Sequence, residues 1–264
     1  MDLGLRGKRA LVTGSTAGIG FATAKLLAAE GATVVVNGRT AARATKAADE
    51  IRNQVRGARV EAVAADLGSA AGCSELAARV PDVDVLVNNV GIFEPKPFEQ
   101  ITDADWMRFF ETNVMSGVRL SRFYLPKMRE RGWGRIVFVS SESAVQIPAE
   151  MIHYGMTKTA QLAIARGLAE TTTGSGITVN SVLPGPTASE GVGTFVRQMA
   201  QQRGVEFAEM EREFFASARP SSLLKRFTTP EEIASMITYV CSARASATNG
   251  AAIRADGGVV RSIL

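Results

Sequence analysis

Short runs rich in β-branched residues alternate along this sequence with longer, alanine-rich segments of helical period. The predicted strands cover residues 9–13, 33–37, 59–64, 83–88, 135–140 and 177–183, with a last short one at 251–254. The predicted helices cover residues 19–30, 41–54, 73–80, 103–131, 151–172 and 231–242. Most strand runs are continuously apolar, which is typical of a sheet covered by helices on both faces. The alternation therefore predicts an α/β fold with a doubly wound parallel sheet and right-handed crossovers.

No linker, repeat or low-complexity segment divides the 264 residues, so we predict a single domain, 1–264. One stretch, about 187–228, interrupts the alternation and has the pattern of a helical insertion. Its apolar residues are Phe195, Met199, Phe207, Met210, Phe214 and Phe215. Two interpretations fit: amphipathic helices that cover their own core, or a lid whose apolar face lines a substrate pocket. We favour the lid, because long insertions in compact α/β domains are often functional.

Composition and charge argue against several classes of protein. Cys73 and Cys241 are the only cysteines and form no C-x-x-C pair, which excludes a disulfide scaffold and predicts reduced thiols. No apolar run approaches the roughly 18 residues of a membrane span, and no signal-peptide pattern opens the chain, so we expect a cytoplasmic protein without a membrane partner. The net charge of +4 comes from scattered basic residues, which predicts no nucleic-acid partner. His153 is the only histidine; we expect it to pack or lie at an interface, and we expect no metal site.

A glycine-rich turn follows the first predicted strand, with the sequence Thr13-Gly14-Ser15-Thr16-Ala17-Gly18-Ile19-Gly20. Its glycines permit a tight turn and a close approach of the backbone to a ligand. The free N–H groups and the dipole at the start of the next helix favour a pyrophosphate there. Such a turn alone is as typical of an ordinary strand–helix connection, but its place at the first junction favours dinucleotide binding. No G-x-x-x-x-G-K-[ST] motif is present, which argues against a nucleoside triphosphatase.

A tyrosine and a lysine have the spacing of a catalytic pair. Tyr154 and Lys158 are four residues apart, so on a helix they share one face. A phenol with a pKa of about 10 is a poor catalyst at neutral pH, but an adjacent ammonium and an oxidised nicotinamide would lower that pKa. Ser141, at the end of the fifth predicted strand, is suited to donate a hydrogen bond to a substrate oxygen. A surface Tyr–Lys pair is the commoner explanation of the pair alone; Ser141, Asn113 and the glycine-rich turn together favour catalysis.

These motifs resemble those of the short-chain dehydrogenase/reductase family, in its branch of chains about this long and near its 3-oxoacyl-ACP reductase-like members. The matching segments are Gly14-x-x-x-Gly18-x-Gly20, Asn88-Asn89-Val90-Gly91, Asn113, Ser141, Tyr154-x-x-x-Lys158, Pro184-Gly185 and Asp256-Gly257-Gly258. Val90 departs from the family's usual alanine, which adds bulk near the cofactor but removes no polar group. The resemblance covers essentially the whole chain and implies a Rossmann-like fold.

The resemblance also implies roles for individual residues. The catalytic set would be Asn113, Ser141, Tyr154 and Lys158, with Asn113 holding a water linked to Lys158 as a proton route. The cofactor would contact Gly14, Ser15, Thr16, Gly18, Ile19, Gly20, Arg39, Asp66, Leu67, Asn89, Gly91, Tyr154, Lys158, Pro184, Gly185 and Thr187. Within this set, Asp66 would bond the adenine amino group with the Leu67 backbone beside it, and Lys158 would also grip the nicotinamide ribose.

The end of the second predicted strand bears on the choice of cofactor. A carboxylate there accepts hydrogen bonds from the ribose hydroxyls of NAD and repels a 2′-phosphate. Gly38 stands where NAD-preferring members of the family have Asp, and the Arg39 guanidinium suits a phosphate. Arg39 as a solvated loop residue is the alternative, but the missing acid favours NADP(H) over NAD(H).

The sequence therefore predicts an NADP(H)-dependent oxidoreductase that interconverts a ketone and a secondary alcohol by hydride transfer, with Tyr154 as general acid/base. One alternative is an NADP(H)-binding sensor without catalysis, which has no need of the four catalytic residues. A second alternative is a methyltransferase on a similar sheet, which has no use for the Tyr–Lys pair.

The substrate and the assembly are less constrained by the sequence. The substrate is expected to be a small carbonyl or alcohol compound, partly apolar. Glu142 either contacts a polar substrate or is solvated, and a further set forms pocket walls or core: Phe93, Ile147, Met151 and Pro186. Helices 103–131 and 151–172 carry apolar residues beyond one face, which predicts a homotetramer or, failing that, a dimer. These residues are Phe109, Phe110, Phe123, Leu162, Ile164 and Leu168.

Overall fold

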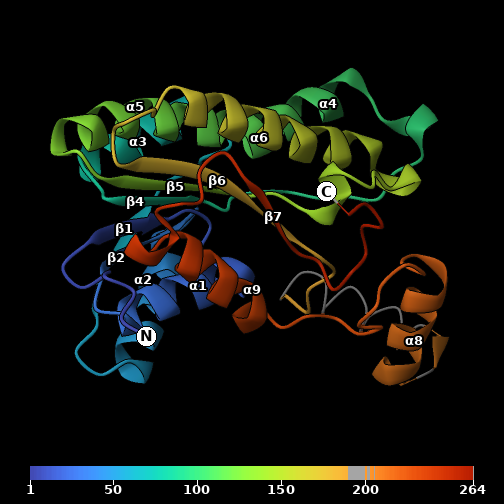
Figure 1. The fold of residues 1–264 in the computed structure, drawn as a ribbon. Helices are drawn as coiled ribbons and strands as arrows, with labels where there is room; N and C mark the ends of the chain where they lie inside the picture. The colour runs from blue at the N-terminus through green and yellow to red at the C-terminus, as the bar shows by residue number, and fades with distance from the viewer. Residues whose placement is uncertain (190–199, 201–202, 205, 264) are drawn as a thin grey trace.

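Seven parallel strands form one sheet in the part of the chain that the computed structural model describes, residues 1–189, 200, 203–204 and 206–263. The strands are β1 (Arg9–Val12), β2 (Thr33–Gly38), β3 (Arg59–Ala64), β4 (Val85–Asn88), β5 (Gly134–Val139), β6 (Ile177–Pro184) and β7 (Ala252–Ala255). Their order across the sheet is β3-β2-β1-β4-β5-β6-β7 (Figure 1). The order reverses between β1 and β4, which opens a crevice at the carboxyl ends of these strands. The predicted single-domain, doubly wound parallel sheet is confirmed.

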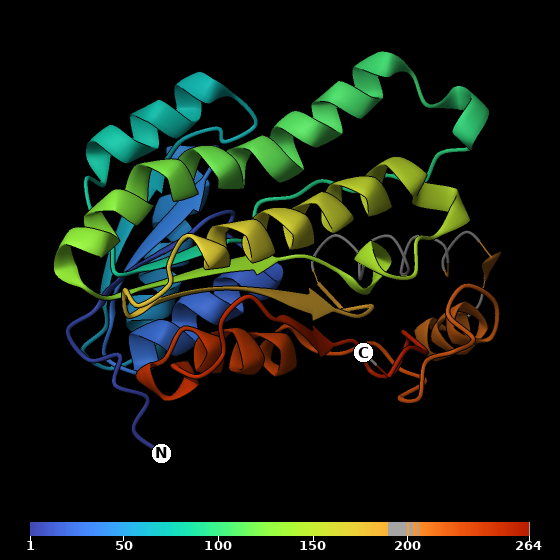
Figure 2. The ribbon, with the colours of Figure 1, turned by 45° about the horizontal axis from the view of Figure 1, so that its top comes forward.

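Helices cover both faces of the sheet (Figures 1 and 2). One face carries α1 (Gly18–Ala29), α2 (Ala41–Gln54) and α9 (Pro230–Val240); the other carries α3 (Ala70–Arg79), α5 (Ser116–Arg131) and α6 (Ile152–Glu170). Successive side chains of a strand pack into the cores on opposite faces of the sheet. In β1, Ala10 and Val12 pack on the α1 side and Leu11 packs on the α5 side. Because strands are buried on both sides, their sequences are continuously apolar.

The predicted helix 103–131 is helical along its whole length, with a local change of helix type near its middle. Helix α4 (Asp103–Phe110) begins with a capping box and runs into a π-helical turn, Glu111–Met115, before α5. Such a turn adds one residue to the helical repeat, so the faces of α4 and α5 are out of phase. The predicted helical span 103–131 is therefore confirmed, and the π-helical turn within it is a feature that the apolar pattern did not predict.

The insertion between β6 and α9 contains helix α8 (Phe207–Ser217), which lies apart from the sheet in Figure 1. Four aromatic rings pack together around it, from Phe207, Phe214, Phe215 and Phe227. This segment thus has a small core of its own, as one of the two interpretations expected. Phe195 and Met199 lie outside the described residues. Within the described part of the chain, no helix is both long and apolar enough to cross a membrane.

Candidate active site

The glycine-rich turn joins β1 to α1 at the carboxyl edge of the sheet. Gly14 and Gly18 have φ angles of +59° and +56°, a left-handed conformation that L side chains rarely adopt. Helix α1 begins after Ala17, whose side chain provides no cap. The first N–H groups of α1 are thus left for a ligand at the positive end of the helix dipole. This terminus fits a pyrophosphate.

Polar side chains hold the turn in place. Asn89, after β4, donates from Nδ2 to the carbonyl oxygens of Thr13 and Gly14 at 2.9 and 3.1 Å. Buried Asn37 in β2 accepts from the Gly14 N–H at 3.2 Å. The Ser15 hydroxyl accepts from the Asn37 N–H at 3.0 Å, so this side chain serves the turn itself. Sequence reasoning missed Asn37, although a lone amide in an apolar strand is a recognisable signal.

Gly38 ends β2 and lies against Thr16. A Cβ at position 38 would collide with Thr16 Cγ2, so a larger residue does not fit beside Thr16 in this position. Arg39 is exposed directly beyond Gly38. Two further cations, Arg43 and Lys46 in α2, line a hollow next to Thr16. Their place beside the turn depends on how α2 packs and could not be predicted from the sequence.

A cleft of about 660 Å³ runs from the start of α1 to Tyr154. Of the predicted site residues it is lined by Gly18, Ile19, Gly20, Asn89, Gly91, Ser141, Tyr154, Lys158, Pro184, Gly185 and Thr187. The predicted residues that do not line it are Gly14, Ser15, Thr16, Arg39, Asp66, Leu67 and Asn113. Phe93, Met151 and Pro186 line the cleft as pocket walls, whereas Ile147 does not. The structure thus brings the helix terminus and three of the four catalytic candidates into one cavity.

Asp66 and Leu67 follow β3 at the same edge of the sheet. The Asp66 carboxylate is exposed and accepts from the Gly68 N–H at 3.1 Å, which shapes the turn into α3. Leu67 is buried at 2% exposure and belongs to the core on the α5 side of the sheet.

Tyr154 lies near the start of α6, with the ring of Phe93 edge-on at 6.4 Å between centroids. Burial raises the pKa of its phenol, and the Glu142 carboxylate raises it further. Hydrogen bonding with Ser141 and the charge of Arg219 oppose that rise without cancelling it. The protein's own groups therefore keep the phenol protonated at neutral pH. The lowering expected from Lys158 together with an oxidised nicotinamide stays a prediction for the cofactor-bound site.

Lys158 is buried at the floor of the cleft, with its Nζ 5.6 Å from the centroid of the Tyr154 ring. The ammonium donates to the Val139 carbonyl oxygen at 2.9 Å and to Gln161 Oε1 at 3.4 Å. Removal from water lowers the pKa of Lys158 to about 8. Two of its three N–H groups are used in this way among the described residues.

Asn113 lies in the π-helical turn, a feature common at functional sites. Its side-chain amide accepts from the Ile92 N–H at 2.7 Å and donates to the Ile92 carbonyl at 2.9 Å and to Thr157 Oγ1 at 3.0 Å. Its backbone carbonyl accepts from Gln161 Nε2 at 2.6 Å. The side chain of Gln161 thus links the Asn113 backbone to Lys158, and the water implied by the resemblance stays a prediction. Gln161 was missed, although it is a polar residue on the buried face of a helix.

Ser141 is followed by a buried carboxylate. The Ser141 hydroxyl donates to Glu142 Oε2, and Arg219 donates from Nε to Glu142 Oε1 at 3.0 Å. Arg219 also donates from Nη1 to Glu150 Oε1 at 3.2 Å. Glu142 and Arg219 are only 5% and 8% exposed, so the interpretation of Glu142 as a solvated carboxylate was wrong.

The far wall of the cleft is formed by the insertion between β6 and α9. It includes Met210, Glu213 and Phe214 on α8 and Arg219 just after that helix. The insertion therefore covers its own core and also lines the cavity, so the two interpretations of it are not exclusive.

His153 is fully buried and packs against Phe109 and Trp106, with ring centroids at 4.0 and 6.0 Å. Its ring nitrogens have no hydrogen-bond partner among the described residues. Burial lowers the pKa of the imidazole, which fits packing better than acid–base catalysis. In the described part of the chain, no three His, Cys, Asp or Glu side chains are grouped as metal ligands.

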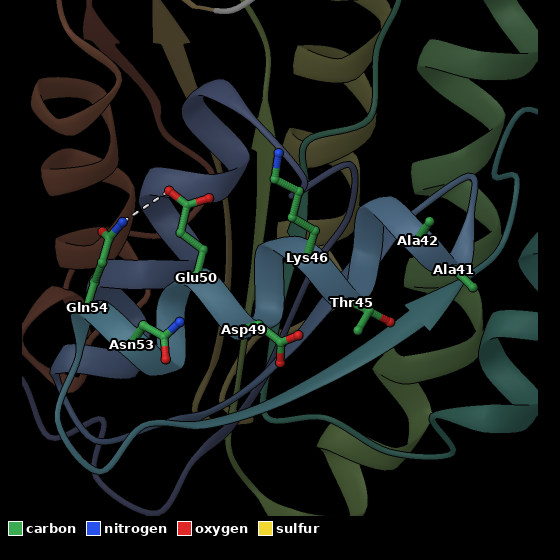
Figure 3. A pocket seen from close by; sticks show the side chains of 8 residues that line it. All are labelled: Ala41, Ala42, Thr45, Lys46, Asp49, Glu50, Asn53 and Gln54. Atoms are coloured by element: carbon green, nitrogen blue, oxygen red, sulfur yellow. Dashed lines mark hydrogen bonds between the residues drawn. The ribbon is translucent and has the colours of Figure 1, made fainter.

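A second hollow lies on the outer face of α2 (Figure 3). All of its lining side chains belong to that one helix, and they include Lys46, Asp49 and Glu50. It has no second wall, so it is a shallow surface feature rather than a binding site.

Three comparisons extend these observations. A family model described as short chain dehydrogenase matches residues 8–200. The uncharacterized oxidoreductase YvaG of Bacillus subtilis (strain 168) is 49% identical over 263 residues, which cover 100% of both chains. The 3-oxoacyl-[acyl-carrier-protein] reductase FabG of Aquifex aeolicus (strain VF5) is 31% identical over 263 residues, 98% of this chain and 100% of that one. The crystal structure of L-sorbose reductase from Gluconobacter frateurii, complexed with NADPH and L-sorbose, superposes with a TM-score of 0.94 at 32% identity, covering 100% of both chains.

Proposed function

This chain belongs to the short-chain dehydrogenase/reductase family, and from that premise we propose that it is an NADP(H)-dependent oxidoreductase interconverting a ketone and a secondary alcohol. Tyr154 is the proposed general acid and base. One observation carries the proposal: a single cleft joins the start of α1 to Ser141, Tyr154 and Lys158. It combines an anion-binding helix terminus with an acid–base group, and nicotinamide-dependent carbonyl reduction requires both.

The residues present fit a nicotinamide dinucleotide. The pyrophosphate is assigned to the uncapped first turn of α1, at Gly18, Ile19 and Gly20. A Cβ on Gly91 would stand 3.4 Å from Lys158 Nζ, so the glycine keeps the floor of the cleft open. The nicotinamide end is assigned to Lys158, Tyr154, Pro184, Gly185 and Thr187. When bound, the cofactor supplies or accepts the hydride.

The side chains have complementary roles in this scheme. The raised pKa keeps Tyr154 protonated, and the protonated phenol is the form that donates to a carbonyl oxygen during reduction. Ser141 donates a hydrogen bond to the same oxygen as negative charge develops on it. Lys158, with a pKa of about 8, is largely an ammonium at neutral pH and helps to stabilise that charge. In the oxidative direction Tyr154 takes the proton back.

A preference for NADP(H) is proposed from the end of β2. Gly38 presents no carboxylate, and Thr16 packs into the space that one would need. Arg39 beyond it is suited to a 2′-phosphate, and Arg43 and Lys46 add positive charge beside the same turn. The L-sorbose reductase complex, which holds NADPH, is in line with this assignment.

A homotetramer, or failing that a dimer, is proposed for the assembly. Large apolar side chains are exposed in and just before α4, with Phe98 at 57% and Met107 at 60% exposure. Exposed apolar groups of this size are typical of contact surfaces. A cytoplasmic location stays a prediction; the buried free thiols of Cys73 and Cys241 suit a reducing compartment.

The direct test follows the absorbance of NADPH while ketones of different classes are presented to the purified protein. The proposal expects NADPH to be consumed with at least one class and NADH to be used less well. Tight NADPH binding without turnover of any ketone would instead favour the sensor.

A further inference from the structure

The substrate end of the cleft has a charged wall. It carries Glu142, Glu150 and Arg219, joined by the ion pairs described above. Arg203 and Glu213 from the α8 segment also line it and pair with each other. If Lys158 at the floor of the cleft is left out, this wall carries three carboxylates and two guanidiniums, which gives the wall a net charge of −1.

The remaining wall is apolar, with Phe93, Met151, Met210 and Phe214 lining the cleft. The Phe93 ring stands edge-on to Tyr154, next to the proposed reacting position. A ligand that fits both walls has carbon–hydrogen surface on one side and several hydrogen-bonding groups on the other.

The hydrogen bond between Ser141 and Glu142 constrains what can react. An ionised carboxylate only accepts hydrogen bonds, so Ser141 must direct its single proton at Glu142. Hydrogen bonds to charged groups are about twice as strong as neutral ones, so a simple ketone competes poorly for that proton. A substrate that brings its own donor to Glu142 removes this obstacle.

We propose that the substrate is an uncharged ketone with a hydroxyl group on the carbon next to the carbonyl, as in a polyhydroxylated ketone. That hydroxyl replaces Ser141 as the donor to Glu142 Oε2, while Arg219 keeps its bond to Glu142 Oε1. Ser141 then turns its proton to the carbonyl oxygen. The carbonyl carbon takes a hydride from the reduced cofactor and its oxygen takes the proton of Tyr154, which gives a vicinal diol. This inference rests on the proposed function.

Anionic substrates are disfavoured by the same wall. Arg219 donates from its Nε to Glu142 and from its Nη1 to Glu150 and to the Ala218 carbonyl oxygen, so its positive charge is already shared between two carboxylates.

The test uses a pair of ketones of similar shape, hydroxyacetone and butanone, which differ by a hydroxyl in place of a methyl, together with the anion acetoacetate. With NADPH we expect kcat/KM for hydroxyacetone to exceed that for butanone by about 10-fold or more, with acetoacetate lower still. Glu142→Gln should reduce the hydroxyacetone-to-butanone ratio by about 10–100-fold, because it removes the charged acceptor and releases Ser141. Glu209→Gln, an exposed position on α8, is the matched control and should leave the ratio unchanged.

Breaking one half of a buried ion pair can unfold a protein, so the double variant Glu142→Gln/Arg219→Gln and the thermal unfolding of each variant are measured as well. Wild-type protein that reduces butanone or acetoacetate as well as hydroxyacetone would overturn the substrate inference and leave the proposed function standing. If NADPH binds but none of the three ketones, nor any other, is reduced, the proposed function and this inference fail together.

Discussion

Gln161 donates from Nε2 to the backbone carbonyl oxygen of Asn113 at 2.6 Å. The other end of the same carboxamide accepts from Lys158 Nζ at 3.4 Å. Gln161 is 1% exposed, so this bridge between the π-helical turn and the lysine is shielded from water. A fixed side chain orients the ammonium through one of its three donors.

Gln161→Met tests this bridge, because methionine has a similar length but neither hydrogen bond. Loss of an acceptor disfavours the charged form, so the pKa of Lys158 should fall below its value of about 8. We expect kcat for ketone reduction to drop by about 10-fold and the alkaline limb of its pH profile to move to lower pH. The measurement is kcat against pH for wild type, Gln161→Met and an exposed control, Gln54→Met. If Gln161→Met is less stable than wild type but the alkaline limb of its pH profile does not move, Gln161 serves only in packing.

Tyr154→Phe keeps the ring and removes the proton donor. Turnover should fall by about 10²-fold or more while the dissociation constant for NADPH changes little. Ser141→Ala should mainly lower turnover, whereas Lys158→Ala should impair both turnover and cofactor binding. Steady-state kinetics and binding titrations separate these outcomes. Near-normal turnover by Tyr154→Phe would show that another group supplies the proton.

Arg39→Ala tests the choice of cofactor. Only NADPH carries a 2′-phosphate, so its affinity should fall by about 10-fold or more while that for NADH changes little. Arg56→Ala, an exposed position beyond the end of α2, serves as the control for a general loss of positive charge. Equal losses for both cofactors in binding titrations would contradict the assignment.

His153→Phe tests how burial of an imidazole affects stability. Because burial lowers the pKa of His153 in the folded protein, the unfolded chain takes up a proton first as the pH falls below about 6.5. The carboxylates of Asp105 and Glu94 oppose this effect only in part. Wild type should therefore lose free energy of unfolding between pH 7.5 and 5.5 more steeply than His153→Phe, whose ring still packs on Phe109. Denaturant titrations at the two pH values give both slopes, and parallel slopes would contradict the prediction.

Light scattering at micromolar concentration tests the assembly. A homotetramer should give close to four times the chain mass of 28.0 kDa, and a dimer close to twice that mass. A mass near that of one chain would overturn the proposed association.

The strands and the motif residues could be predicted because each depends on local sequence. Apolar runs specify buried strands whatever lies around them, and spacings such as that of Tyr154 and Lys158 specify a shared helix face. The π-helical turn could not be read in this way. It shifts the apolar face of α4 relative to that of α5, which a single helical period does not describe. Phe109, one of the residues from which association was predicted, is fully buried against His153 and is not exposed to a partner.

Residues whose roles depend on tertiary contacts also could not be predicted from the sequence. Arg219 is 77 residues from Glu142 along the chain, and only the packing of the insertion brings the two together. The rise in the pKa of Tyr154 could not be predicted for the same reason: its burial and the nearness of Glu142 are properties of the folded cleft.

The contact between Gly38 and Thr16 has an evolutionary consequence. An aspartate at position 38 brings a Cβ into Thr16 Cγ2, and the β-branched threonine has few rotamers in which to move aside. The two positions are therefore epistatic. A carboxylate at position 38 is therefore accommodated only if the Thr16 side chain shifts or is replaced, so residue 16 restricts which side chains position 38 can carry.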